Sequence, residues 1–74
     1  MNIGDLIRLK RKSHRLTQRE LGKILLSSSN KISRLEKNPM TLLSFDLNEL
    51  HRLSNTLDID INLLIEEKRK LNNK

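Results

Sequence analysis

The chain has 74 residues, of which 35% are hydrophobic, and a net charge of +6 from 15 Lys and Arg against 9 Asp and Glu. It contains no Cys, which excludes disulfide scaffolds and thiolate metal sites, and no Val, which argues against an all-β domain. No apolar run approaches the ~20 residues of a membrane-spanning helix, and the N-terminus carries Asp5 but no apolar signal-peptide stretch. We therefore expect one small, all-α, cytoplasmic domain with no place in a membrane.

The positive charge lies almost entirely in the first half of the chain. Residues 1–37 hold ten basic and three acidic side chains, whereas residues 38–74 hold five basic and six acidic ones. A basic half beside a near-neutral half indicates that the two halves have different roles. The first half would face a polyanion, and the second would form the fold or pair with another chain. Basic composition alone is weak support for this, since many basic proteins bind no polyanion.

Two helices are predicted before residue 27. Residues 2–13 carry apolar side chains at spacings of three and four, which place them on one helical face. These side chains are Ile3, Leu6 and Ile7. Thr17 and Glu20 then form a T-x-x-E capping box, in which each side chain satisfies a free backbone amide of the other residue. The box predicts a second helix over residues 18–25.

A third helix is predicted between two groups of turn-forming residues. Residues 27–30 read Ser-Ser-Ser-Asn, which are types that cap helices or make turns. The helix that follows is expected to run to about Lys37 and to end at Asn38, because the residue before Pro39 avoids the helical region. Residues 39–45 are expected to form a loop with an unusually large number of apolar side chains.

Two further helices are predicted in the second half. Asp46 and Glu49 form another capping-box pattern, and Asp60 is a candidate cap for a last helix. Their apolar faces consist of Leu47, Leu50, Leu53 and Leu57 in the fourth helix and Ile61, Leu64 and Ile65 in the fifth. The complete prediction is a compact five-helix bundle that forms one domain over residues 1–70, with a frayed tail at 71–74.

Three motifs stand at fixed distances within residues 16–36: Leu-Thr-Gln, Glu-Leu-Gly, and Ile-Ser-Arg-Leu-Glu. Without gaps, this segment resembles the helix-turn-helix of the XRE family, which includes the Cro proteins and repressors of lambdoid phages. The resemblance implies a lambda repressor-like DNA-binding domain. It further implies a transcriptional regulator, most simply a repressor, whose dimer binds an inverted-repeat operator in double-stranded DNA through the major groove.

The resemblance also implies individual roles in DNA binding. The base-reading positions fall on Ser28, Ser29, Asn30, Lys31 and Arg34. The family's contact with the DNA backbone falls on Gln18, and Arg19 beside it, Lys37 and Arg11 are further candidates for phosphate binding. Arg11 has a structural interpretation first, since the family often pairs this position with that of Glu36 in a partly buried salt bridge. For the third helix the alternative is that Ser28 or Ser29 only caps it, and that Asn30, Lys31 and Arg34 form a plain exposed face.

The segment departs from the family pattern at two positions that often hold glycine, Arg15 and Leu26. A non-glycine residue in the left-handed backbone region costs ~1–2 kcal/mol, so Leu26 leaves room for a re-formed turn. The loop at residues 39–45 is also longer than is usual in the family. These departures put the tilt of the third helix in question.

A dimer interface is expected on the less basic half, because several apolar residues there have no certain place in so small a core. The candidates are Ile61, Ile65, Leu42 and Phe45. Soluble monomers seldom expose a contiguous apolar patch. The alternative for Phe45 is that the loop folds it back over the core.

The remaining chemistry is sparse. His14 and His51 have no acidic residue at metal-ligand spacing, and no phosphate-binding glycine loop is present. We expect no enzymatic activity, no metal and no cofactor. A second functional hypothesis is a protein-interaction module, an antitoxin-like protein or an antagonist of another regulator. A third and weaker one is binding of a membrane surface by the basic first helix.

Overall fold

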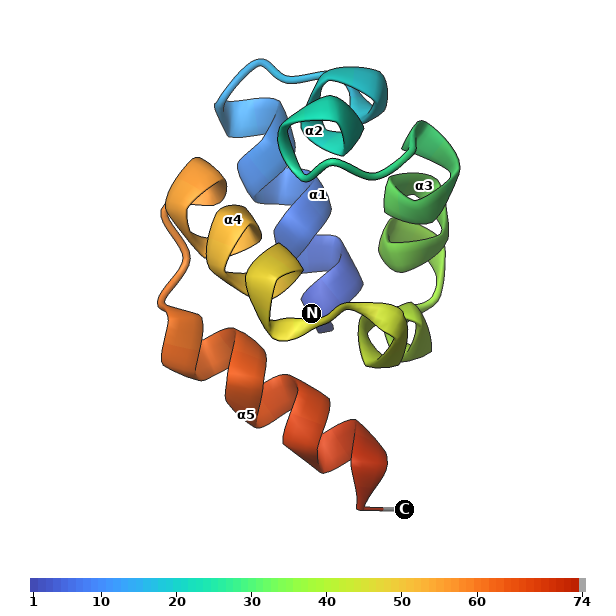
Figure 1. Ribbon diagram of the computed structural model, residues 1–74, viewed down its shortest axis with the longest axis vertical. Coiled ribbons are helices and arrows are strands. Elements are labelled where there is room, and N and C mark those ends of the chain that lie inside the picture. Colours follow the sequence, from blue (N-terminus) through green and yellow to red (C-terminus); the bar gives the residue numbers. More distant parts are fainter. Residues whose placement is uncertain (74) are drawn as a thin grey trace.

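The computed structural model describes residues 1–73, which contain five α-helices, one 3-10 helix and no strand (Figure 1). The helices are α1 (Ile3–Ser13), α2 (Gln18–Ile24), α3 (Ser29–Lys37), the 3-10 helix η1 (Pro39–Ser44), α4 (Leu47–Leu57) and α5 (Ile61–Asn72). Their Cα atoms have a radius of gyration of 11.0 Å. The predicted all-α class is confirmed. Within the described residues, no helix has the length and apolar character to cross a membrane.

The prediction of a loop over residues 39–45, and with it the number of five helices, is wrong. Asn38 caps η1 through its side chain, which accepts a hydrogen bond from the Met40 amide at 3.1 Å. Pro39 occupies the first turn, where its fixed φ is already helical and its missing amide costs nothing. Leu42 and Phe45 anchor the segment because both side chains are fully buried. Capping and burial together convert the expected loop into a helical turn.

The predicted capping boxes form. Thr17 Oγ1 accepts from the Glu20 amide at 3.0 Å, and the Glu20 carboxylate accepts from the Thr17 amide at 2.9 Å. Asp46 and Glu49 make the same reciprocal pair at the start of α4. At the other end of the chain α5 continues to Asn72, so helix covers residues 71 and 72 of the tail expected at 71–74, of which residue 74 lies outside the described residues.

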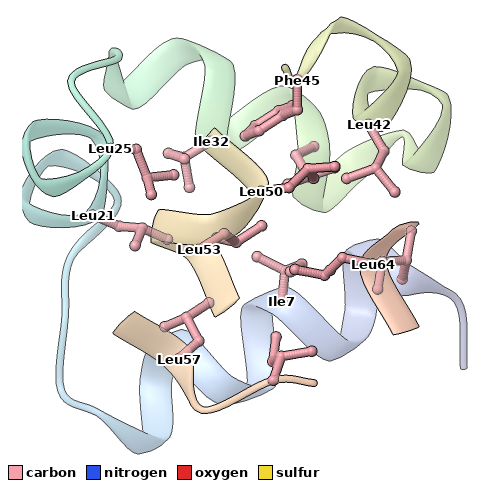
Figure 2. Packing of buried hydrophobic residues seen from close by; sticks show 13 residues of the cluster. Ile7, Leu21, Leu25, Ile32, Leu42, Phe45, Leu50, Leu53, Leu57 and Leu64 are labelled. Atoms are coloured by element: carbon pink, nitrogen blue, oxygen red, sulfur yellow. The ribbon is translucent and has the colours of Figure 1, made fainter. Parts of the chain in front are cut away.

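One hydrophobic core joins all the helices (Figure 2). Its buried members are Ile3, Ile7, Leu21, Leu25, Ile32, Leu35, Leu42, Phe45, Leu50, Leu53, Leu57, Ile59 and Leu64. α3 packs against α1, α2 and η1, whereas α5 packs against α4 and η1. In Figure 1, α2 therefore lies at one end of the long axis and α5 at the other.

The α2–α3 crossing depends on a small residue and on a strained turn. A Cβ atom at Gly22 would lie 2.8 Å from the Ser28 carbonyl carbon, so any other residue would push the two helices apart. Leu26, in the turn between them, adopts the left-handed region at φ 56° although it carries a side chain, and Arg15 before α2 does the same. The turn thus retains a left-handed backbone at Leu26, which costs ~1–2 kcal/mol for a residue with a side chain.

Candidate nucleic-acid interface

The start of α3 is fixed by Ser28. Its backbone is extended, and its hydroxyl oxygen accepts from the Lys31 amide at 3.2 Å, so Ser28 is the N-cap. Both Ser28 and Ser29 remain exposed. The cap therefore uses one lone pair of Ser28 and leaves its hydroxyl hydrogen available to an outside acceptor.

α3 presents an exposed polar and basic face. Asn30, Arg34 and Lys37 are separated by four and three residues, so they lie along one side of the helix. All three side chains are exposed, and none forms a hydrogen bond or ion pair with another residue of the described range 1–73. Ile32 and Leu35 occupy the opposite, buried side. The helix is held by its apolar side and leaves its polar side exposed.

Lys31 does not belong to that exposed face, because its side chain is paired within the protein, and its role as a base-reading residue stays a prediction. Its Nζ atom lies 2.8 and 3.0 Å from the two carboxylate oxygens of Glu49 on α4. It also donates to the Ser44 carbonyl at 3.1 Å and stands 4.5 Å from the centroid of the Phe45 ring. These partners turn the ammonium group toward Glu49 and the segment that precedes α4.

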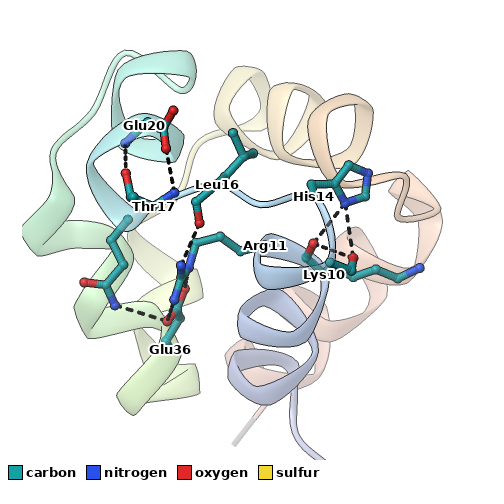
Figure 3. A network of polar contacts seen from close by, with 9 residues as sticks. Lys10, Arg11, His14, Leu16, Thr17, Glu20 and Glu36 are labelled. Atoms are coloured by element: carbon teal, nitrogen blue, oxygen red, sulfur yellow. Dashed lines mark hydrogen bonds and ion pairs between the residues drawn. The ribbon is translucent and has the colours of Figure 1, made fainter.

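A buried polar network joins α1, α2 and α3 (Figure 3). Arg11 donates from Nε to Glu36 Oε2 at 2.6 Å and from Nη2 to Oε1 at 3.1 Å. Its Nη1 donates to the Leu16 carbonyl at 2.8 Å. The Gln18 amide donates to Glu36 Oε1 at 3.1 Å. Arg11 is thus first a structural residue, and the pairing of Arg11 with Glu36 implied by the resemblance is present.

A groove of about 270 Å³ opens beside this network. Its lining consists of Arg8, Arg11, Lys12, Gln18, Glu36 and Lys37. Because Arg11 neutralises Glu36, the exposed charges of Arg8, Lys12 and Lys37 dominate. The structure thus brings together Arg11, Gln18 and Lys37, three of the four residues predicted to bind phosphate. Arg19, the fourth, is exposed on α2 next to Gln18.

Arg8 and Lys12 were not identified from the sequence as site residues. They stand four apart on α1 and therefore share a face of that helix. Helical periodicity could have grouped them with each other. Their proximity to Gln18 and Lys37 depends on how α1 crosses α3, a tertiary feature that the Arg11–Glu36 pair fixes.

Two titratable groups near the start of α2 and the end of α1, Glu20 and His14, have shifted pKa values. The backbone amide and the hydroxyl of Thr17 lower the pKa of Glu20, because both hydrogen bonds favour the carboxylate. The Lys10 carbonyl, and after it the Asp58 carboxylate, raise the pKa of His14. His14 lies at the end of α1 with Nδ1 2.9 Å from that carbonyl and Nε2 3.2 Å from Asp58.

The predicted dimer interface is corrected at two of its four residues. Leu42 and Phe45 are 0% exposed, because η1 folds them into the core, so neither can contact a second molecule. Ile61 is half-buried against the core, and Ile65 is 41% exposed. Ile65 lines an apolar groove of about 300 Å³ between α4 and α5, together with Leu47, Leu50, Lys68, Arg69 and Asn72.

Among the described residues, no three His, Asp or Glu side chains gather where they could hold a metal ion. Comparison with known proteins gives no match to a protein-family model, a curated protein or a solved structure. The features that bear on function are the exposed face of α3, the basic groove beside it and the apolar groove between α4 and α5.

Proposed function

We propose that this protein is a sequence-specific DNA-binding regulator of the XRE type, with α2 and α3 as its helix-turn-helix. The observation that carries the proposal is the position of the basic groove directly beside the exposed face of α3. A DNA-reading helix needs polar side chains toward base edges and cations toward the flanking phosphates. Both surfaces are present on the basic half of the chain, and the near-neutral half covers the core behind them.

In this proposal α3 enters the major groove. Asn30 pairs with adenine through its amide, and Arg34 pairs with guanine through its guanidinium group. Ser29 and the free hydroxyl hydrogen of Ser28 contact neighbouring bases or phosphates. The N-terminal part of the helix, where these residues stand, carries no acidic side chain that would repel DNA.

The basic groove then receives the DNA backbone. Gln18 has one amide hydrogen committed to Glu36 and a second one available for a phosphate oxygen. Arg8, Lys12 and Lys37 surround that position with positive charge, and Arg19 extends it along α2. Phosphate contacts of this kind fix the register of the protein on DNA without reading sequence.

A homodimer follows from the small size of one such unit, and we propose that two α5 helices form it. Ile65 supplies an exposed apolar contact in the groove that Leu47 also lines. An antiparallel pair of α5 helices would bring the basic last turn of one, with Arg69 and Lys70, toward the acidic start of the other at Asp60. Unlike charges and opposed helix dipoles favour this arrangement. The dimer would act in the cytoplasm, as a repressor on an inverted repeat.

The same apolar groove supports the alternative that the main ligand is another protein. Leu47 is 55% exposed there, and a partner helix with apolar and acidic residues would complement Lys68 and Arg69. A regulator that is controlled by an antagonist would bind DNA through α3 and the antagonist through the apolar groove. The two hypotheses therefore differ in whether DNA or a protein is the main ligand.

Selection of bound sites from random double-stranded DNA tests the proposal. We expect an enriched inverted repeat for the natural protein. Asn30→Ala and Arg34→Ala should each lose about 1–3 kcal/mol of preference at one base pair of each half-site. Gln18→Ala should weaken all sequences equally, because phosphates carry no sequence information. Arg52 is an exposed cation on α4 that lines neither groove, so Arg52→Ala is the control. It should change neither the base preference nor the overall affinity. Recovery of random sequence would refute the proposal.

A further inference from the structure

Lys31 is the one basic residue of α3 whose charge is turned away from the exposed face. Its ammonium group has three hydrogens, and the structure gives it three oxygen acceptors: both carboxylate oxygens of Glu49 and the Ser44 carbonyl. The Phe45 ring adds a cation–π contact. The ammonium group therefore has no donor left for DNA.

The contact is partly buried. The side chains of Lys31 and Glu49 are 25% and 14% exposed, so water screens the pair less than a surface ion pair. Glu49 is itself held in place, because one of its oxygens accepts from the Asp46 amide in the capping box of α4. The first turn of α3 is thereby attached to the first turn of α4 through two side chains of fixed orientation.

Phe45 extends this connection to α5. Its ring faces Lys31 of α3, and its backbone carbonyl accepts a hydrogen bond from Lys68 of α5. The residue is fully buried, so it cannot shift without disturbing the core. Lys68 also lines the apolar groove in which Ile65 stands. One buried residue therefore links the DNA-facing helix to the helix that we propose pairs in the dimer.

We infer that Lys31 is a positioning residue, which sets the orientation of α3 relative to α5 through Glu49 and Phe45. In a dimer built on α5, this orientation fixes the distance and angle between the two α3 helices. It thereby determines which separation of half-sites the dimer prefers, without any contact between Lys31 and DNA. The inference rests on the proposed function, because the separation of half-sites has meaning only for a DNA-binding dimer.

The test measures affinity for a series of operators whose two half-sites are moved apart or together by one base pair at a time. We expect the natural protein to prefer one separation. Lys31→Met and Glu49→Gln should each reduce that preference by about tenfold, and the double variant should lose no more than either single one, because both break the same contact. Lys31→Arg, which keeps charge and ring contact, should restore the preference.

The salt dependence of binding separates positioning from direct contact. Loss of a phosphate-binding cation lowers the slope of log affinity against log salt by about one. Lys31→Met should leave that slope unchanged, whereas Lys37→Met, at the exposed end of the same helix, should lower it. A lowered slope for Lys31→Met, or an unchanged preference in Glu49→Gln, would overturn the inference.

Failure to fold and failure to bind DNA lead to different conclusions. If Lys31→Met does not fold, as judged by circular dichroism, Glu49→Gln and Lys31→Arg carry the test, since one keeps the shape of the pair and the other its charge. If the natural protein binds no operator at any separation, the proposed function fails and the inference fails with it. If it binds with a preference that Glu49→Gln leaves intact, only the inference fails.

Discussion

Arg11 on α1 and Glu36 on α3 are joined by two hydrogen-bonded contacts, of 2.6 Å from Nε to Oε2 and 3.1 Å from Nη2 to Oε1 (Figure 3). Their side chains are only 10% and 4% exposed. The geometry of a fork on a carboxylate makes such a pair directional, so it fixes how the two helices cross. The same carboxylate holds Gln18, which places the start of α2 beside them.

Loss of one partner of this pair should be costly. We expect Arg11→Met to destabilise the fold by about 3–5 kcal/mol, because Glu36 would remain buried without a counter-charge. Chemical denaturation followed by circular dichroism measures this. The double variant Arg11→Met with Glu36→Gln should be more stable than Arg11→Met alone, since no buried charge is left. Equal stability of the two variants would show that Glu36 finds another partner or water.

Replacing Leu26 with glycine should stabilise the fold. The φ of 56° at Leu26 costs ~1–2 kcal/mol for a residue with a side chain, and the leucine side chain is 76% exposed, so truncation removes little packing. Relief of this strain is offset in part, because glycine makes the unfolded chain more flexible and this costs about 0.5–1 kcal/mol of stability. The net effect of Leu26→Gly should be a rise in melting temperature of a few degrees, which differential scanning calorimetry detects.

A matched substitution checks this account of the turn. Lys23→Gly, at an exposed helical position in the last turn of α2, should destabilise by about 1 kcal/mol. A loss of stability in Leu26→Gly as well would mean that the leucine side chain makes a stabilising contact.

Stability should fall as the pH rises through the titration of His14. The protonated ring donates from both nitrogens, to the Lys10 carbonyl and to Asp58, and this raises its pKa above the ordinary 6.5. A raised folded-state pKa gives stability that is complete below about pH 6.5 and is lost as the pH passes the folded-state value. Urea denaturation between pH 5.5 and 8.5 measures the change. This window lies above the range in which Glu20 and Glu66 titrate, because their pKa values are lowered from 4.5.

His14→Gln should flatten that dependence, because glutamine carries no titrating proton. The second histidine provides the control. His51→Gln, on the exposed side of α4, should retain the decline in stability with pH. The reverse pattern would place the effect on α4 instead of at the end of α1.

Ile65→Glu should give a folded monomer. The residue is 41% exposed, so a carboxylate there reaches water in the monomer but would be buried between two α5 helices. Light scattering should report half the mass of the dimer that we propose for the natural protein, and affinity for a half-site should remain measurable but weak. Leu63→Glu, on the same helix and 40% exposed but lining a different groove with Met1 and Leu6, should stay dimeric. A dimeric Ile65→Glu would place the interface elsewhere.

Features set by neighbouring residues were predictable from the sequence, and features set by distant ones were not. The capping box at Thr17 and Glu20 depends on two side chains three residues apart, and it forms as expected. Lys31 stands among exposed polar residues, and nothing local indicates that its ammonium group turns toward Glu49, eighteen residues further along. Phe45 is buried only because η1 folds across the core.

The candidate site also combines local features that the sequence predicts with tertiary features that it does not. Its members on α3 could be listed from the resemblance and from helical spacing, since Asn30 and Arg34 lie one turn apart on the polar side. The contribution of α1 could not, because Arg8 and Lys12 join the groove only through the crossing of α1 with α3. That crossing depends on the Arg11–Glu36 pair, whose partners are 25 residues apart.

The salt dependence of binding measures whether the basic groove contacts DNA phosphates. Fluorescence anisotropy of the natural protein with its selected inverted repeat, at 50 and 200 mM salt, gives the number of phosphates that the basic groove and its symmetry mate neutralise. A dimer with about 6–10 phosphate contacts should lose about 10³–10⁵ in affinity between these two concentrations. A triple variant that replaces Arg8, Lys12 and Lys37 by Gln should show a much shallower slope. No binding at 50 mM salt, or an affinity that does not change with salt, would show that the basic groove is not a DNA-binding surface.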